Sequence, residues 1–187
     1  MKDEVRVLGV DDGYFLKHQG KKVLVVGAIL RGNKDLEGVI SCHITRDGSD
    51  STKRLIGLVN GSRHKNQLRY IITNGTTFGG FNILDINELY EKTRVPVTAV
   101  LRKRPNQQKV ERALSHLPDK RKRLDKMRKA GQIYSHKSLY FQMAGMSERE
   151  AKELIDKTIK IGNLPEPVRV AHLIASGVTY GESTKRA

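Results

Sequence analysis

The chain has 187 residues, of which 37% are hydrophobic, and this composition excludes a disordered polypeptide and indicates one soluble domain with a buried core. No apolar run approaches the ~20 residues that span a bilayer, the first residues lack the apolar core of a signal peptide, and the single Cys42 excludes an intramolecular disulfide. We therefore expect a cytoplasmic protein without a membrane partner, and the formal net charge of +15 predicts a polyanionic partner.

Three strands open the predicted fold. Hydrophobic patterns predict them over 5–10, 21–30 and 36–45, and the short glycine-containing turns between them favour an antiparallel meander. Apolar residues at helical spacing then predict a helix over 51–64, although two glycines weaken this pattern. A fourth strand is expected over 68–73.

Helix and strand alternate after this point. A helix over 83–93 separates the fourth strand from a fifth over 96–101, so these two strands should pair in parallel with a right-handed crossover. The result is an α/β protein whose mixed five-stranded sheet has three antiparallel strands, then two parallel strands, and is flanked by helices. This is the strand order of the ribonuclease H-like fold.

The remainder of the chain is predicted to be helical. The expected helices cover 107–117, 120–130, 147–160 and 167–176. Ser147 and Glu150 form a capping box at the start of the third of these helices. We therefore expect one domain over 1–187, with a basic helical insertion over 105–145 and C-terminal helices over 147–187.

The positive charge is concentrated in one stretch. Residues 102–129 contain twelve Lys and Arg against three Asp and Glu, a net charge of +9. Clustering favours a nucleic-acid footprint over general solubility charge, and the stretch lacks the large apolar anchors of a membrane-surface helix. The candidate phosphate contacts are Arg102, Lys103, Arg104, Lys120, Arg121, Lys122 and Arg123.

Carboxylates follow several of the predicted strands. Asp11 and Asp12 end the first strand within Gly9-Val10-Asp11-Asp12-Gly13, although Asp-Gly is also a common hairpin turn. Neighbouring residues of a strand point to opposite faces, so only one of them can enter a given site. Asp50 and Asp85 follow later strands, and each is equally compatible with a position at a helix start. These four carboxylates are the candidate ligands for Mg²⁺ or Mn²⁺, because such ions prefer hard oxygen donors.

A glycine-rich segment follows the fourth strand. Gly79 and Gly80, with Asn82 beside them, could bring backbone close to a phosphate or a base, although flexible turn packing is the commoner meaning of such glycines. Asn74 stands at the strand end where a catalytic sheet would place a carboxylate. Its amide has no charge and binds Mg²⁺ weakly.

The chain resembles a mainly archaeal family of endonuclease V relatives that is described as a domain of unknown function. The resemblance covers nearly the whole chain, and its most specific part is Leu164-Pro165-Glu166-Pro167-Val168-Arg169-Val170-Ala171-His172. The other segments are Gly9 to Gly13, Asn74-Gly75 with Gly79 to Asn82, and Pro96 to Val100 with its basic tail. The resemblance implies a ribonuclease H-like fold and Mg²⁺-dependent cleavage near deaminated adenine in DNA or RNA.

The resemblance also implies roles for single residues. Asp11 matches the first metal-binding Asp of endonuclease V, Asp50 lies near the place of its metal-associated Glu, and His172 lies where some members have a metal-proximal histidine. Asn74 falls where endonuclease V has its second Asp, and is thus a departure from that enzyme, while Lys103 or Arg102 falls near a lysine that follows its last core strand. The strand-separating Pro-Tyr-aliphatic-Pro wedge is absent, so recognition of hypoxanthine is not transferred.

Three hypotheses for the function follow. The first is a Mg²⁺-dependent nuclease with Asp11 as central ligand and Asp50 and His172 as further catalytic residues. The second is a non-catalytic nucleic-acid-binding module, and the third, an enzyme on a small nucleotide, is disfavoured by the length of the basic stretch. Arg169 should lie near the site with His172, since they share a helix face; the alternative pairs Arg169 with Glu166. The choice between DNA and RNA, and the oligomeric state, stay open.

Overall fold

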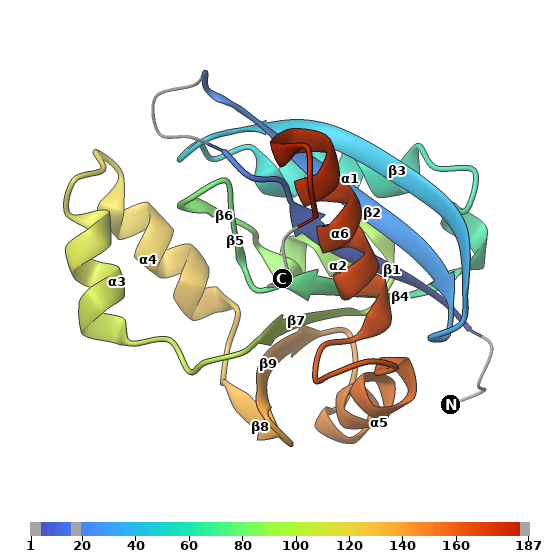
Figure 1. Cartoon of the computed structure of the whole chain (residues 1–187). Coiled ribbons are helices and arrows are strands. Elements are labelled where there is room, and N and C mark those ends of the chain that lie inside the picture. The colour runs from blue at the N-terminus through green and yellow to red at the C-terminus, as the bar shows by residue number, and fades with distance from the viewer. Residues whose placement is uncertain (1–4, 16–19, 184–187) are drawn as a thin grey trace.

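The structure is a computed structural model that describes residues 5–15 and 20–183. Its centre is a seven-stranded mixed sheet in the order β3-β2-β1-β4-β7-β9-β8, with helices on both faces (Figure 1). The first residues, on which the expectation of no signal peptide rests, and the end of the predicted C-terminal region lie outside the described residues. Within the described ranges, no helix combines the length and the apolar character needed to cross a membrane.

The five strands expected from the sequence are present and pair in the predicted directions. They are β1 (Arg6–Asp12), β2 (Lys22–Arg31), β3 (Asp35–Thr45), β4 (Leu68–Asn74) and β7 (Val97–Leu101). The β1–β2 and β2–β3 pairs are antiparallel, whereas the β1–β4 and β4–β7 pairs are parallel. The carboxyl ends of β1, β4 and β7 therefore lie at one edge of the sheet, where α/β proteins commonly bind their ligands.

A hairpin extends this sheet, so the expected count of five strands is wrong. β9 (Leu139–Ala144) pairs antiparallel with β7, and β8 (Tyr134–His136) pairs with β9. Only the first part of the predicted helical insertion over 105–145 is helical, as α3 (Gln107–Leu114) and α4 (Lys120–Lys129). Leu139 and Phe141 are buried on either side of the partly exposed Tyr140, and this alternation is the strand signal in this region.

The remaining predicted helices are present in the predicted order. All but the last are shorter than predicted, whereas the last, predicted over 167–176, extends from Glu166 to Tyr180. The helices are α1 (Ser51–Asn60), α2 (Ile86–Thr93), α5 (Glu148–Thr158) and α6 (Glu166–Tyr180), and a short 3₁₀ turn, η1 (Lys65–Gln67), precedes β4. Two short strands, β5 (Thr77–Phe78) and β6 (Asn82–Ile83), form a separate hairpin before α2. The predicted helix over 83–93 therefore begins three residues later, because its first residue belongs to β6.

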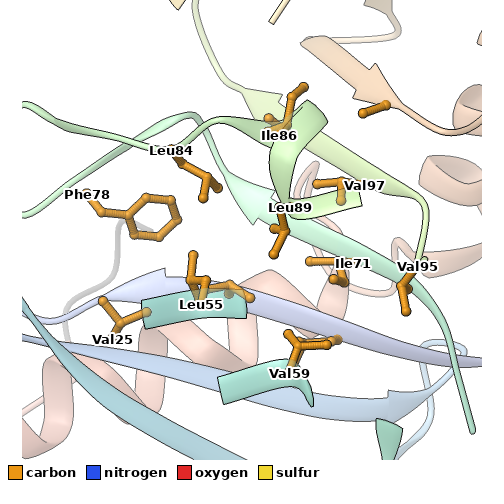
Figure 2. Packing of buried hydrophobic residues seen from close by; sticks show 14 of the residues in the cluster. Val25, Leu55, Val59, Ile71, Phe78, Leu84, Ile86, Leu89, Val95 and Val97 are labelled. Atoms are coloured by element: carbon orange, nitrogen blue, oxygen red, sulfur yellow. The ribbon is translucent and has the colours of Figure 1, made fainter. Parts of the chain in front are cut away.

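The two faces of β1 pack against different helices. Leu8 and Val10 belong to the larger hydrophobic cluster, to which α1 and α2 contribute Leu55 and Leu89 (Figure 2). Val7, on the opposite face, belongs to a second cluster formed with α5 and α6. By the alternation of a strand, Asp11 shares the face of Val7 and Asp12 the face of Leu8.

α6 lies directly against the backbone of β1. A Cβ atom added to Gly9 would lie 2.0 Å from the carbonyl carbon of Pro167 and 2.4 Å from the backbone nitrogen of Val168. Only glycine permits this approach, so the first turn of α6 is fixed over the middle of β1. The next turns of the helix then pass over Asp11, at the carboxyl end of the strand.

Candidate functional site

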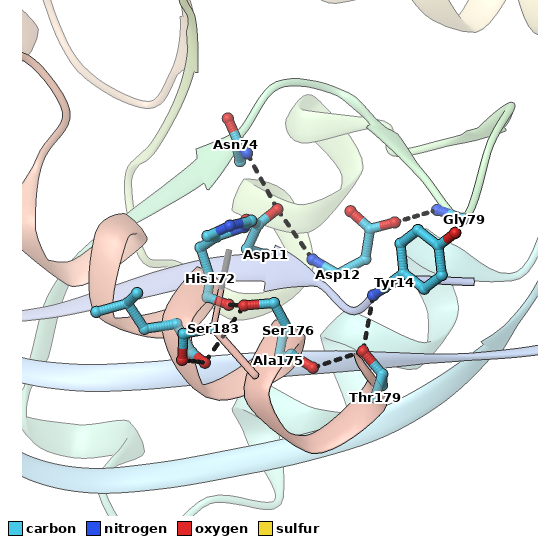
Figure 3. Close-up of polar contacts among 11 residues, drawn as sticks. Asp11, Asp12, Tyr14, Asn74, Gly79, His172, Ala175, Ser176, Thr179 and Ser183 are labelled. Carbon is cyan, nitrogen blue, oxygen red and sulfur yellow. Dashed lines mark hydrogen bonds and ion pairs between the residues drawn. The ribbon is translucent and has the colours of Figure 1, made fainter. Parts of the chain in front are cut away.

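Asp11 is the centre of a polar cluster at the carboxyl edge of the sheet. Asp11 is 3% exposed, and its Oδ2 lies 2.9 Å from Nδ1 of His172 in α6. Its Oδ1 accepts hydrogen bonds from the side-chain amide of Asn74 at 3.1 Å and from the backbone N–H of Asp12 at 2.9 Å (Figure 3). The expected proximity of His172 to Asp11 is therefore confirmed.

Asp12 occupies the other face of β1. Its Oδ2 accepts a hydrogen bond of 2.8 Å from the backbone N–H of Gly79, on the side of the β5–β6 hairpin (Figure 3). Burial and the neighbouring charge of Asp11 raise the pKa of Asp12 to about 7. Asp12 is thus a partly buried carboxyl group that keeps its proton up to a pH well above the ordinary range for an aspartate.

The donor groups around Asp11 determine what kind of cation they could hold. No group of three or more His, Cys, Asp and Glu side chains suited to a metal ion occurs within residues 5–15 and 20–183. Asp11 offers carboxylate oxygens and Asn74 an amide oxygen, since Asn74 uses its Nδ2 toward Asp11. Mg²⁺ is commonly held by one or two carboxylates together with substrate phosphates and water. The residues present therefore fit a cation shared with a phosphate, and they do not form an all-protein cage.

Asp50 closes the turn that follows β3. Its carboxylate accepts hydrogen bonds from the backbone N–H and the hydroxyl of Thr45, at 3.0 and 3.1 Å, and from Nδ2 of Asn82 at 2.7 Å. Partial burial raises its pKa, but these hydrogen bonds outweigh burial and hold the pKa of Asp50 below its ordinary value. Its carboxylate thus stabilises a turn and is not joined to the Asp11 cluster.

Asp85 is the N-cap of α2. Its Oδ1 accepts hydrogen bonds from the backbone N–H groups of Asn87 and Glu88, at 3.1 and 3.0 Å. This arrangement satisfies two of the amides that a helix start leaves without intrahelical partners. Asp85 therefore has the capping role that the sequence left open as its alternative to metal binding.

The loop that contains Gly79 and Gly80 packs against the carboxylate of Asp47. Gly80 has a φ of +86°, and a Cβ added there would lie 2.3 Å from Oδ1 of Asp47, which accepts a hydrogen bond from the Phe81 N–H at 2.9 Å. Asn82 is fully buried, and its amide hydrogens go to the carbonyl of Thr45 and to Asp50. The expectation that Asn82 contacts nucleic acid is corrected by this burial, because its donors are already used.

The basic stretch is exposed except at one residue. Arg102, Lys103, Arg104, Arg121 and Lys122 are exposed, and Lys120 is partly exposed. Arg123 is only 6% exposed. Among the candidate phosphate contacts, Arg123 is therefore the one whose side chain is buried in the domain.

Arg123 attaches α4 to the domain. Its guanidinium donates to the carbonyls of Asp47 at 2.7 Å, Gly48 at 2.8 Å and Phe81, and it pairs with Asp119 at 2.7 Å. All of its acceptors belong to the protein, so this arginine positions the basic helix. Sequence alone gives no sign of this, since four basic residues in succession occupy every side of a helix.

Arg169 lies one turn before His172 on α6. Its Nε and Nη2 each lie 2.7 Å from an oxygen of Glu166, and these hydrogen bonds raise the pKa of the guanidinium. The alternative pairing with Glu166 thus exists. Arg169 nevertheless lines the same cavity as His172 and Arg102, so the pairing does not remove it from the site.

Comparisons with known proteins show the family to which the chain belongs. A model of the family described as "Endonuclease dU" matches residues 3–179. A UPF0215 protein from Methanothermobacter thermautotrophicus is 46% identical over 187 residues, which cover 98% of this chain and 92% of that protein. The crystal structure of a protein of unknown function from Archaeoglobus fulgidus has a TM-score of 0.88 at 35% identity and covers 94% of this chain and 98% of that chain.

A more distant likeness identifies the fold. Endonuclease V from Ciona intestinalis, solved with a 24mer DNA containing an inosine followed by a ribo-adenosine, has a TM-score of 0.57 at 13% identity. The match covers 90% of this chain and 82% of that chain. At this identity the likeness concerns the fold, which is the expected ribonuclease H-like arrangement with an additional hairpin. The chain therefore belongs to the endonuclease dU family, an archaeal family of uncharacterised proteins related to endonuclease V.

Proposed function

We propose that this protein is a metal-dependent endonuclease that cleaves a nucleic-acid strand near a deaminated base. The observation that carries the proposal is the buried cluster of Asp11, Asn74 and His172 at the carboxyl edge of the sheet. The matched family has an endonuclease in its description, and the exposed basic residues beyond β7 and on α4 suit phosphate binding.

Deoxyuridine is the first substrate to test. The family description contains dU, the usual abbreviation of deoxyuridine, and the similar endonuclease V was solved with inosine. Both are products of deamination, of deoxycytidine and of adenosine respectively. DNA containing deoxyuridine is therefore the proposed substrate, and inosine is the alternative to be compared with it.

The residues of the cluster have different proposed roles. Asp11, with the amide oxygen of Asn74, would hold Mg²⁺ or Mn²⁺, and the ion supplies charge neutralisation at the scissile phosphate and a more acidic bound water. His172 fixes the orientation of the Asp11 carboxylate through its Nδ1. We propose that Asp12 holds the carboxyl end of β1 from the opposite face of the sheet. It would lose its proton and become negatively charged when a cation neutralises Asp11.

A cleavage assay on labelled oligonucleotides tests this proposal. Duplexes that contain a single deoxyuridine, an inosine or a thymidine are incubated with Mg²⁺, Mn²⁺ or chelator, and RNA strands with the same bases are included. We expect metal-dependent cleavage of the deoxyuridine strand by the wild type and none by Asp11→Asn. Asp35→Asn is the matched control, because Asp35 is an exposed carboxylate at the start of β3, away from this edge. Equal cleavage by Asp11→Asn would contradict the assignment.

A non-catalytic binding module is the second candidate. It is favoured by Asn74, which places an uncharged amide beside Asp11, and by the hydrogen bonds that already occupy both oxygens of Asp11. Such a protein would bind the same strands with and without divalent ions and would cleave none of them. The cleavage assay and a binding titration in chelator therefore separate the two candidates.

A further inference from the structure

A cavity of about 580 Å³ opens on the α6 side of the sheet, next to the Asp11 cluster. Its wall comes from the end of β7, the turn between β8 and β9, the loop between α5 and α6, and α6 itself. His172 belongs both to this wall and to the cluster, since its Nδ1 lies 2.9 Å from Asp11. The cavity therefore adjoins the proposed site, and His172 is the side chain that the two have in common.

Two arginines line the cavity: Arg102 brings a positive charge, and Arg169, which is paired with Glu166, brings a guanidinium donor. Arg102 is exposed where the chain leaves β7, and Arg169 faces the cavity from α6. Arg169 donates from Nε and Nη2 to the carboxylate of Glu166, which is 5% exposed. The Nη1 of Arg169 is not used by this pair. A guanidinium fixed in this way is oriented for binding without further loss of side-chain entropy.

Aliphatic side chains form the rest of the wall. Leu139 and Leu164 are buried, Leu173 is partly buried, and Ile161 is 59% exposed although it is large and apolar. A cavity of this volume is within the ordinary range for small-molecule sites, about 300–1,000 Å³, and larger than one phosphate needs. Cationic groups on one side and aliphatic groups on the other suit a phosphate joined to a less polar group, such as a sugar or a base.

We propose that this cavity binds one nucleotide of the nucleic-acid strand, next to the phosphate that lies at Asp11. Arg102 and Arg169 contact its phosphate, and the aliphatic side chains of Leu164 and Ile161 pack against its sugar or base. The assignment of that strand as the substrate rests on the function proposed above. Nucleotide binding itself does not, because it needs neither a metal ion nor cleavage.

Binding in the presence of chelator tests the inference separately from catalysis. The probes are thymidine 5′-monophosphate, followed by NMR shifts of the protein, and a fluorescently labelled single strand of five thymidines, followed by anisotropy. We expect Arg102→Gln to weaken both by about tenfold, because it removes a charge-assisted hydrogen bond. Arg69→Gln, which removes an exposed arginine at the opposite end of β4, should leave both unchanged.

A second pair of variants distinguishes a loss of binding at the cavity from a general effect of added charge or of misfolding. Ile161→Glu introduces a carboxylate into the cavity at a position exposed enough to tolerate it, and it should abolish binding of the mononucleotide. Val178→Glu, at a residue of α6 that is 70% exposed and outside the cavity wall, is its control. The inference is overturned by an unchanged affinity in Ile161→Glu, by equal losses in both variants of either pair, or by a strand that does not compete with the mononucleotide. A wild type that binds in this way but never cleaves DNA would refute the proposed function and keep the inference.

Discussion

His172 and Asp11 lie 161 positions apart in the chain, yet their Nδ1 and Oδ2 atoms are 2.9 Å apart. Their side chains are 13% and 4% exposed, so the contact is almost entirely shielded from water. A buried carboxylate requires a partner of this kind, because removing a charge from water without compensation is costly. The pair therefore serves the stability of the β1 edge as well as the chemistry proposed for it.

Replacing His172 tests the chemical part of this relationship. His172→Gln keeps a donor that can reach Asp11 but replaces the rigid imidazole ring, which fixes the orientation of the carboxylate, with a flexible amide. We expect cleavage of deoxyuridine DNA to fall by about 10²-fold because the carboxylate is no longer held in one orientation, while binding in chelator stays within about twofold of the wild type because a neutral donor still satisfies the buried carboxylate. A variant that cleaves as fast as the wild type would limit His172 to a packing role.

Asn74→Asp tests the unusual amide beside Asp11. The exchange removes the 3.1 Å hydrogen bond to Asp11 and places a second negative charge next to it. Without metal, we expect the free energy of unfolding to fall by about 1–3 kcal/mol, and Mn²⁺ to restore stability more than it does in the wild type. Thermal unfolding with and without Mn²⁺ measures this, and Asn66→Asp, at an exposed position of η1, supplies the same charge change as a control.

The raised pKa of Asp12 predicts a pH dependence of stability in metal-free protein. Asp12 titrates at about 7 in the folded state and near 3.8 when unfolded, so the folded protein binds the additional proton between these values. The contribution of Asp12 to stability must therefore decrease as pH rises from about 4 to 7 and level off above that. The difference in unfolding free energy between wild type and Asp12→Asn, measured in chelator from pH 5 to 8, should show this slope. A constant difference over that range would contradict it.

The basic residues of α4 should separate into binding and structural groups. Neutralising exposed Arg121 and Lys122 should reduce the salt dependence of DNA affinity, by about 0.9 log unit per log unit of salt for each phosphate that these side chains neutralise, without a change in unfolding. Arg123→Gln should instead cost about 3 kcal/mol of stability, because the carbonyls of Asp47, Gly48 and Phe81 lose a charged donor. Titrations at several salt concentrations and urea unfolding of both variants distinguish the groups; a normal stability of Arg123→Gln would contradict its structural role.

Much of the fold could be predicted because its signals are local. The apolar runs of β1, β2 and β4 and the helix between β4 and β7 determine strand order and direction with few alternatives. Ser147 is the N-cap of α5 as expected, with its Oγ accepting from the Glu150 N–H at 3.2 Å, whereas the Glu150 carboxylate accepts from the Tyr70 hydroxyl at 2.8 Å. The β8–β9 hairpin could not be predicted in the same way, since β8 has only three residues and begins shortly after a highly charged helix.

The site was predictable in part for a different reason. Asp11 and His172 stand in recognisable segments, whereas the role of Asp50 depends on Asn82, which lies 32 positions away and reaches its carboxylate only after the β5–β6 hairpin has formed. The cavity beside His172 could not be predicted for the same reason, because its wall includes the unpredicted turn between β8 and β9. Such contacts depend on tertiary structure, and no local pattern in the chain encodes them.

The contact between Gly9 and the first turn of α6 has a consequence for the order of events during synthesis. β1 is made well before the helix that covers its carboxyl end and brings His172 to Asp11. Until α6 is made, the β1 edge has its aspartates without the histidine, and the cavity lacks one wall. A nascent chain therefore cannot complete the proposed site before α6 has left the ribosome and packed against Gly9.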